Sequence, residues 1–255
     1  MKQIPNIFTL LNLVLGCIAI VYLLENGITL VEDSNGFTYY NLQAEKIYLA
    51  PLFIALAAVV DFFDGFVARL FNNSSEFGKQ LDSLADVVSF GVAPSMIIYQ
   101  FLKLSIAKES NGLDASFLWL VPAFILGAAA AFRLAKFNLS TNQSHAFRGT
   151  PVPAVGILVA SFPLIYWNCD TPWVLNLITN KWFLYAVVLA LSNLMVSNLP
   201  IMSNKPKDKS VSGLMPQIIL AAITLIAAFT IGWLAVPVAF VFFVLLSVVF
   251  KNKLV

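Results

Sequence analysis

Apolar residues run in eight long blocks along the chain, and this pattern constrains the fold more than any other feature of the sequence. The blocks cover roughly residues 7–24, 47–71, 82–104, 117–137, 152–168, 182–199, 214–230 and 233–250. Most of them reach the roughly 17–25 residues that a helix needs to cross the hydrocarbon core of a bilayer. The sequence therefore predicts an all-α, polytopic membrane bundle of about eight transmembrane helices.

The composition excludes the main classes of soluble protein. Of the 255 residues, 60% are hydrophobic and 11% are charged, whereas an ordinary soluble domain carries about 25% charged residues. A soluble enzyme, a disordered chain and a disulfide scaffold are excluded, because a water-exposed surface needs more polar cover. The net charge of +2 predicts no nucleic-acid partner. With one histidine and two unpaired cysteines, any metal site must use oxygen ligands.

Lysine and arginine are distributed unevenly between the segments that connect the blocks. If the N-terminus is cytoplasmic and the spans alternate, the cytoplasmic side holds Lys2, Arg69, Lys79, Arg133, Lys136, Arg148, Lys205, Lys207, Lys209, Lys251 and Lys253. The opposite side holds Lys46, Lys103, Lys108 and Lys181. Because cytoplasmic loops are enriched in these residues, we expect both termini in the cytoplasm and the acidic loop at 25–46 outside.

Four aspartates lie within the second and third blocks. Asp61 and Asp64 fall in the cytoplasmic third of the second helix, and Asp82 and Asp86 fall in the first turns of the third. At about 100° per residue, each pair lies on one face of its helix. Carboxylates inside a membrane are costly and mark functional sites. We therefore expect two acidic faces to meet near the cytoplasmic surface.

Four carboxylates packed together repel one another, and divalent cations relieve this repulsion. Carboxylate oxygens suit Mg²⁺ or Mn²⁺, which proteins often share with a substrate phosphate. We therefore expect Mg²⁺ or Mn²⁺, as two ions, between the two helices. Two other roles for the aspartates stay open. They could cap helices and form ion pairs, which would account for one or two of the four. They could also line a proton or cation path through a transporter, where acidic residues within a membrane also serve.

The aspartates belong to a longer pattern with fixed spacing. It reads Asp61-x2-Asp64-Gly65-x2-Ala68-Arg69-x8-Gly78-x3-Asp82-x3-Asp86. This pattern, over residues 61–86, resembles the signature of the CDP-alcohol phosphatidyltransferase family at all eight of its positions. Flanking segments at 4–12, 82–95 and 147–153 resemble the membrane-embedded phosphatidylserine synthases of bacteria. The resemblance implies a single integral-membrane domain over residues 1–255, with 61–86 as its motif core.

The resemblance also implies a reaction. In it, a metal-dependent enzyme transfers the phosphatidyl group from CDP-diacylglycerol to the hydroxyl of L-serine, which gives phosphatidylserine and CMP. It further implies a homodimer, and we expect it in the bacterial inner membrane with the active site facing the cytoplasm. The alternatives are the same reaction on glycerol 3-phosphate or inositol phosphate, or a cation-coupled transporter.

Residue roles follow from the same resemblance. Asp61, Asp64 and Asp82 would hold the metals, with Asp86 beside the second ion. The residues implied in binding CDP-diacylglycerol are Asp61, Gly65, Ala68, Arg69, Gly78 and Asp82. Asp86 is the candidate catalytic base, because a carboxylate among other carboxylates is a good acceptor for the proton of the serine hydroxyl.

The carboxylate of serine also needs a cation close by. Arg133 and Lys136 lie at the cytoplasmic end of the fourth block, and Arg148 lies in the loop that follows. Each of the three can equally serve to anchor the chain at the membrane surface. We favour Arg148 for acceptor binding, because it stands between Phe147 and a Gly-Thr-Pro turn that makes its setting rigid.

Overall fold

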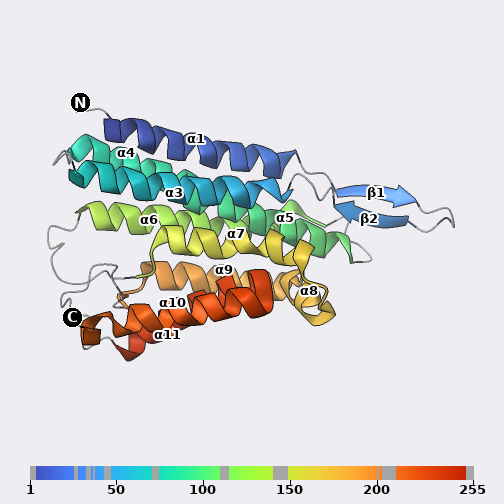
Figure 1. The fold of residues 1–255 in the computed structure, drawn as a ribbon. Helices are drawn as coiled ribbons and strands as arrows, with labels where there is room; N and C mark the ends of the chain where they lie inside the picture. The colour runs from blue at the N-terminus through green and yellow to red at the C-terminus, as the bar shows by residue number, and fades with distance from the viewer. Residues whose placement is uncertain are drawn as a thin grey trace.

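The computed structural model is a bundle of long helices packed side by side (Figure 1). It describes residues 4–25, 28–32, 36, 38–42, 47–70, 75–109, 115–139, 149–199, 201–202 and 211–250. The helices are α1 (Ile4–Leu24), α3 (Leu49–Leu70), α4 (Glu76–Asp86), α5 (Ala93–Ala107), α6 (Ile125–Leu139), α7 (Val152–Asn168), α8 (Pro172–Ile178), α9 (Lys181–Val196), α10 (Val211–Ile231) and α11 (Ala235–Val249). The expected helical bundle is confirmed, and the chain is an integral membrane protein.

Each of the predicted apolar blocks is helical, but not all of them are long. Five described segments are long and apolar enough to cross a membrane: Asn6–Leu24, Leu49–Phe66, Glu76–Ala107, Phe117–Leu139 and Met215–Val249, the last of which contains both α10 and α11. A sixth results if α8 and α9, which meet at a 63° bend, count as one span. Since α7 has 17 residues and falls short of this length, the count of eight spans stays a prediction.

The two ends of the bundle differ in what they carry. Helix α1 begins, α3 ends, α4 begins and α11 ends at the same end of the bundle (Figure 1). We call this the α3–α4 end, and the other the hairpin end. At the hairpin end, α10 turns back into α11 at Gly232, whose φ of +57° favours glycine. The short gap between the last two apolar blocks, at 231–232, is therefore a turn between two helices.

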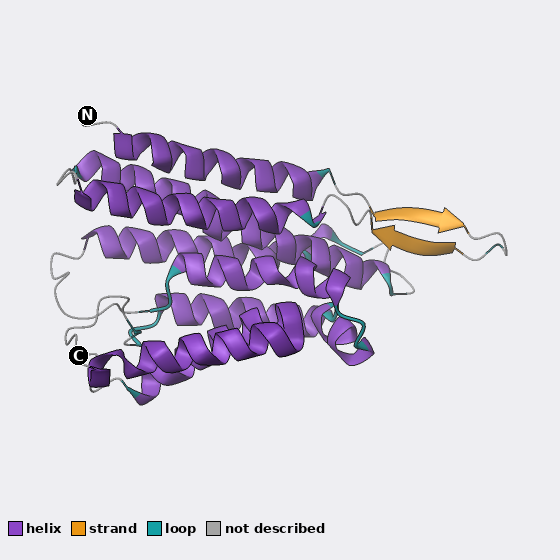
Figure 2. Ribbon diagram, in the orientation of Figure 1, coloured by secondary structure: helices purple, strands orange, loops and turns teal. Residues whose placement is uncertain are grey.

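A small β-hairpin projects beyond the hairpin end (Figure 2). Strand β1 (Ile28–Glu32) pairs antiparallel with β2 (Thr38–Leu42), with Leu30 opposite Tyr40. The prediction of an acidic loop over residues 25–46 is wrong for these two strands. Both strands are rich in β-branched or aromatic residues, which favour strands. The acidic side chains in the same segment had suggested a loop instead.

A π-helical segment, Val87–Val92, joins α4 to α5 and lies at the centre of the packing. Glycines let three other helices approach its backbone. A Cβ on Gly16 of α1 would overlap Ser89, one on Gly156 of α7 would lie 3.0 Å from the Cβ of Phe90, and Gly127 of α6 packs against Gly91. Small residues at such contacts are typical of membrane helices, where close packing rather than burial from water holds helices together.

Replacing Gly16 is therefore expected to destabilise the protein. In Gly16→Ala the new methyl group would meet the Cα of Ser89 at 2.8 Å, and overpacking of this kind costs about 1–3 kcal/mol. We expect a lower thermal midpoint in detergent. Cys17→Ala is the matched control, because Cys17 is the next residue on α1 and is exposed. Equal midpoints for the two variants would contradict the close approach of α1 to Ser89.

Candidate metal centre

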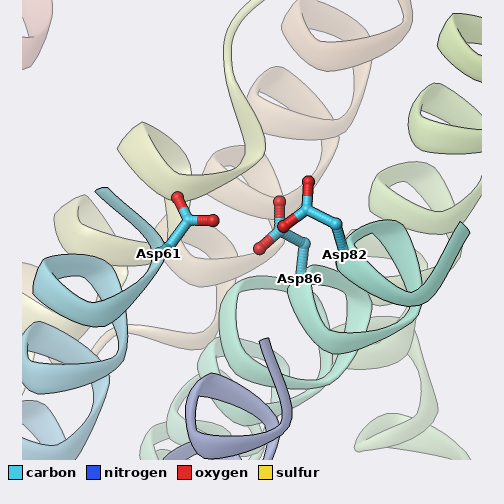
Figure 3. Close-up of side chains that lie close together, drawn as sticks. All are labelled: Asp61, Asp82 and Asp86. Carbon is cyan, nitrogen blue, oxygen red and sulfur yellow. The ribbon is translucent and has the colours of Figure 1, made fainter. Parts of the chain in front are cut away.

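Three carboxylates meet at the α3–α4 end of the bundle. Asp61 comes from α3, and Asp82 and Asp86 come from α4. One oxygen of each carboxylate lies within 4.8 Å of the others, and Figure 3 shows the three side chains turned toward one another. Asp86 is buried, and Asp61 and Asp82 are half-buried. We call these three residues the aspartate triad.

Local sequence explains how α4 presents two members of the triad. Asp82 and Asp86 are four residues apart, so they lie above one another on one face of the helix. Helix α4 starts sharply, because the side chain of Ser75 caps it by accepting a hydrogen bond of 2.9 Å from the backbone N–H of Gly78. A Cβ on Gly78 would lie 3.3 Å from the side-chain oxygen of Asn6. Glycine at this position thus allows α1 to pack close to the start of α4.

Helix α1 supplies two polar side chains that hold the aspartates. Thr9 and Asn12 are 1% and 0% exposed. The hydroxyl of Thr9 donates a hydrogen bond of 2.5 Å to Asp64 Oδ2, and the amide of Asn12 donates one of 3.2 Å to Asp86 Oδ1. The hydroxyl of Ser89 in turn donates to the backbone carbonyl of Asn12 at 2.9 Å. Asn12 is thereby fixed between the π-helical segment and the triad.

Asp64 stands apart from the triad, whereas the sequence predicts four converging carboxylates. Its carboxylate is buried and accepts the hydrogen bond from Thr9. It remains near enough to act electrostatically on Asp61 and Asp82. The structure therefore brings three of the four carboxylates together, and the role of Asp64 as a metal ligand stays a prediction.

Arg133 of α6 is a buried cation near Asp86 of the triad. It is 9% exposed and interacts electrostatically with Asp86. Its Nε atom is buried without a hydrogen-bond partner. Buried polar groups are nearly always paired, so this N–H is free to bind an anionic group of a ligand.

The donor set fits a divalent cation. Three carboxylate oxygens converge from two helices, and Arg133 offsets one of their negative charges. Like charges in a buried site repel strongly, and carboxylate oxygens are the ligands that Mg²⁺ and similar hard cations prefer. The triad is thus a site that could hold a metal ion.

The remaining predicted residues lie in different settings. A Cβ on Gly65 would meet nothing within 4 Å, so there is open space beside Asp61 and Asp64. Ala68 and Arg69 fall in the last turn of α3, but their side chains lie outside the described residues. Lys136 is exposed, and its ammonium donates to Asn198 Oδ1 at 3.4 Å. Arg148 lies outside the described residues.

Sequence reasoning missed the contribution of α1. Thr9 and Asn12 fall within the flanking segment 4–12, for which the resemblance implies no role at the site. The signal was present, because they are two polar residues three positions apart in a helix that is otherwise strongly apolar. Such a pair lies on one face of a helix, and a polar face inside a membrane needs a polar partner.

The chain is similar in sequence to a known protein family and to several of its named members. Residues 2–195 match the family described as CDP-alcohol phosphatidyltransferase. A CDP-diacylglycerol–serine O-phosphatidyltransferase of Helicobacter pylori is 35% identical over 198 residues, which are 76% of this chain and 70% of the relative. One of Bacillus subtilis is 32% identical over 65% of this chain and 78% of its own length. An archaetidylserine synthase of Methanothermobacter thermautotrophicus is 30% identical over 55% of this chain and 58% of its own.

Proposed function

Because the chain belongs to the CDP-alcohol phosphatidyltransferase family, we propose that it transfers the phosphatidyl group from CDP-diacylglycerol to the hydroxyl of L-serine. The products are phosphatidylserine and CMP. The observation that carries this proposal is the aspartate triad, which lies beside a buried arginine with a free N–H. The names of the relatives from Helicobacter pylori and Bacillus subtilis support serine as the acceptor.

The triad would hold the divalent ions that the reaction needs. We assign Asp61, Asp82 and Asp86 as ligands, with Asp64 as the fourth, for two Mg²⁺ or Mn²⁺ ions. When bound, such ions polarise the phosphoryl oxygens and stabilise the departing CMP. The donor lipid would lie beside the triad, against Asp61, Gly65, Ala68, Arg69, Gly78 and Asp82. The open space next to Gly65 supports this placement.

Asp86 is the proposed general base. Its Oδ1 accepts the hydrogen bond from the amide of Asn12, which fixes the orientation of the carboxylate and engages only one of its two oxygens, not the other oxygen, Oδ2. That oxygen would accept the proton of the serine hydroxyl as the hydroxyl oxygen attacks phosphorus. Asn12 acts as a positioning residue here, since it reaches the reaction through Asp86.

Arg133 is the residue that we now propose for the acceptor carboxylate. It is buried beside Asp86, and its Nε–H lacks a partner. A guanidinium binds a carboxylate with strong, charge-assisted hydrogen bonds. Lys136 already donates to Asn198 and is exposed, which favours an anchoring role. Arg148 remains the alternative that the sequence favours.

The Arg133→Ala variant is expected to raise the KM for serine about 10- to 100-fold, the equivalent of one hydrogen bond to a charged group. The KM for CDP-diacylglycerol should change little, because Arg133 would contact only the acceptor. Steady-state release of CMP at varied serine and fixed donor measures both constants. Lys136→Ala is the matched control on the same helix. An unchanged serine KM in Arg133→Ala, together with a raised one in Arg148→Ala, would reassign the role to Arg148.

The proposed function itself is tested by an acceptor panel. Purified protein in detergent receives CDP-diacylglycerol, Mg²⁺ or Mn²⁺, and either serine, glycerol 3-phosphate or inositol phosphate. We expect CMP release with serine alone. Release with another alcohol would keep the reaction and change the acceptor. Ion flux into vesicles without CMP release would instead favour a transporter.

The cellular setting is also part of the proposal. We propose a homodimer in the bacterial inner membrane with the triad facing the cytoplasm. The distribution of lysine and arginine supports this orientation. We treat residues 1–255 as one integral-membrane domain, because α11, which lies beyond the family match, packs against α7 within it.

A further inference from the structure

An apolar cavity of about 300 Å³ lies between α7, α8, α9 and the start of α11. Its walls include Leu158 and Phe162 of α7, Leu177 of α8, Ala190 of α9 and Phe240 of α11, and every side chain that lines it is apolar. It is about twice the size of an engineered apolar cavity of about 150 Å³ that stays dry and binds benzene. A cavity of this kind offers water no partner, and side chains normally fill such space.

The cavity lies toward the hairpin end, away from the aspartate triad. Helix α8 and the first turn of α11, which form part of its wall, both lie at that end. The five tryptophans of the chain are all exposed and fall there too, at the ends of helices or in turns: Trp119, Trp167, Trp173, Trp182 and Trp233. Tryptophan gathers at the boundary between membrane and water. The cavity therefore opens within the half of the bilayer opposite Asp86.

The walls of the cavity combine two parts of the chain. Helices α7 to α9 fall within the family match, which ends at residue 195, whereas α11 lies beyond it. The bend of 63° between α8 and α9 keeps α8 from continuing along α9. Helix α11 and the turn before it thus close a space that the family region leaves open.

We propose that this cavity binds one acyl chain of a membrane phospholipid, separate from the reacting lipid. The lining is uncharged and apolar throughout, which matches a hydrocarbon chain and excludes headgroups, nucleotides and ions. The walls are membrane helices, so lipid is the solvent at the opening. The chain held here does not belong to the reacting lipid, because the reacting phosphate must lie at the triad at the other end of the bundle. This inference does not depend on which alcohol is the acceptor.

Trp173 lines the cavity and reports on its occupant. In a full-length variant that retains Trp173 alone, the other four tryptophans being phenylalanine, phosphatidylcholine brominated on its acyl chains should quench the fluorescence in a saturable manner. We expect half-maximal quenching at about one tenth of the lipid mole fraction required by a variant that retains only Trp182. Trp182 is the control because it is exposed at the same end but does not line the cavity. Equal quenching curves would overturn the proposal.

A filling variant provides the second test. Ala190→Phe places a ring in the cavity and should remove the saturable quenching of Trp173. In the otherwise wild-type protein it should also reduce by one the lipids retained in native mass spectrometry, which needs no tryptophan changes. Ala186→Phe is the control, because Ala186 lies one turn earlier on α9 and does not line the cavity. If Ala190→Phe leaves lipid retention intact, or changes the oligomeric mass instead, the occupant is not an acyl chain.

Discussion

Asp86→Asn is expected to abolish CMP release while leaving the binding of CDP-diacylglycerol largely intact. The amide that replaces the carboxylate cannot accept the proton of the serine hydroxyl, and loss of a general base lowers turnover by about 10²–10⁴-fold. The backbone should not move, because asparagine has nearly the same shape and Asn12 can still donate to its side-chain oxygen. Turnover and donor binding are measured separately, the first by CMP release and the second by calorimetry.

The matched control for Asp86→Asn is Glu76→Gln. Glu76 lies on the same helix, in the first turn of α4, and is exposed. The Glu76→Gln variant should keep full turnover. A loss of turnover confined to Asp86→Asn would then be due to the triad and not to the net charge of α4. Normal CMP release by Asp86→Asn would remove the proposed base.

Asp61→Asn is expected to remove the response of the protein to divalent ions. In the wild type, Mg²⁺ or Mn²⁺ should raise the thermal midpoint, because an ion at 100 times its Kd stabilises a folded protein by about 2.7 kcal/mol. Asp61 is the only member of the triad that α3 supplies, so its loss leaves the triad with the two carboxylates of α4. Turnover by Asp61→Asn should fall too, because the variant binds the ions less well.

The same variant should be more stable than the wild type when no divalent ion is present. Asp61 interacts with both Asp82 and Asp64, and removing one of several like charges from a partly buried site relieves repulsion. Thermal unfolding in detergent with and without Mg²⁺ tests both effects, and titration calorimetry counts the ions. Asp170→Asn, an exposed aspartate between α7 and α8, is the control. Undiminished ion uptake by Asp61→Asn would contradict the triad as the metal site.

Much of the bundle was predictable, since apolar runs report directly on burial in lipid. The shared face of Asp82 and Asp86 was readable from sequence too, whereas the third apolar block begins six residues after the start of α4 at Glu76. The β-hairpin was missed because the strand preference of its residues is a weak signal, and the acidic residues of the same segment suggested a loop. The π-helical segment was missed because it depends on how α1, α6 and α7 press against Val87–Val92, and no single stretch of sequence encodes that contact.

The candidate site, too, was predictable from the sequence only in part. Spacing along two helices was enough to predict that acidic faces meet, because α-helical geometry repeats from residue to residue. Asp64 contacts Thr9 whereas Asp61 lies in the triad, and this difference depends on how α3 is rotated about its axis relative to α1. Likewise, the choice between Arg133 and Lys136 needed burial and free hydrogen-bonding groups, which the sequence does not contain.

By itself, the sequence determined that this chain lies in a membrane as helices, that it carries four carboxylates that could hold a divalent ion, and which family signature those carboxylates form. These properties depend on residue type and on spacing within one helix. The tertiary structure alone decided which carboxylates converge, which helix orients Asp86, which arginine lies near it, and that a cavity stays open between α7, α8, α9 and α11. Those properties depend on how helices distant in sequence rotate and pack against one another, and in lipid that packing is set by side-chain fit rather than by hydrophobic pattern.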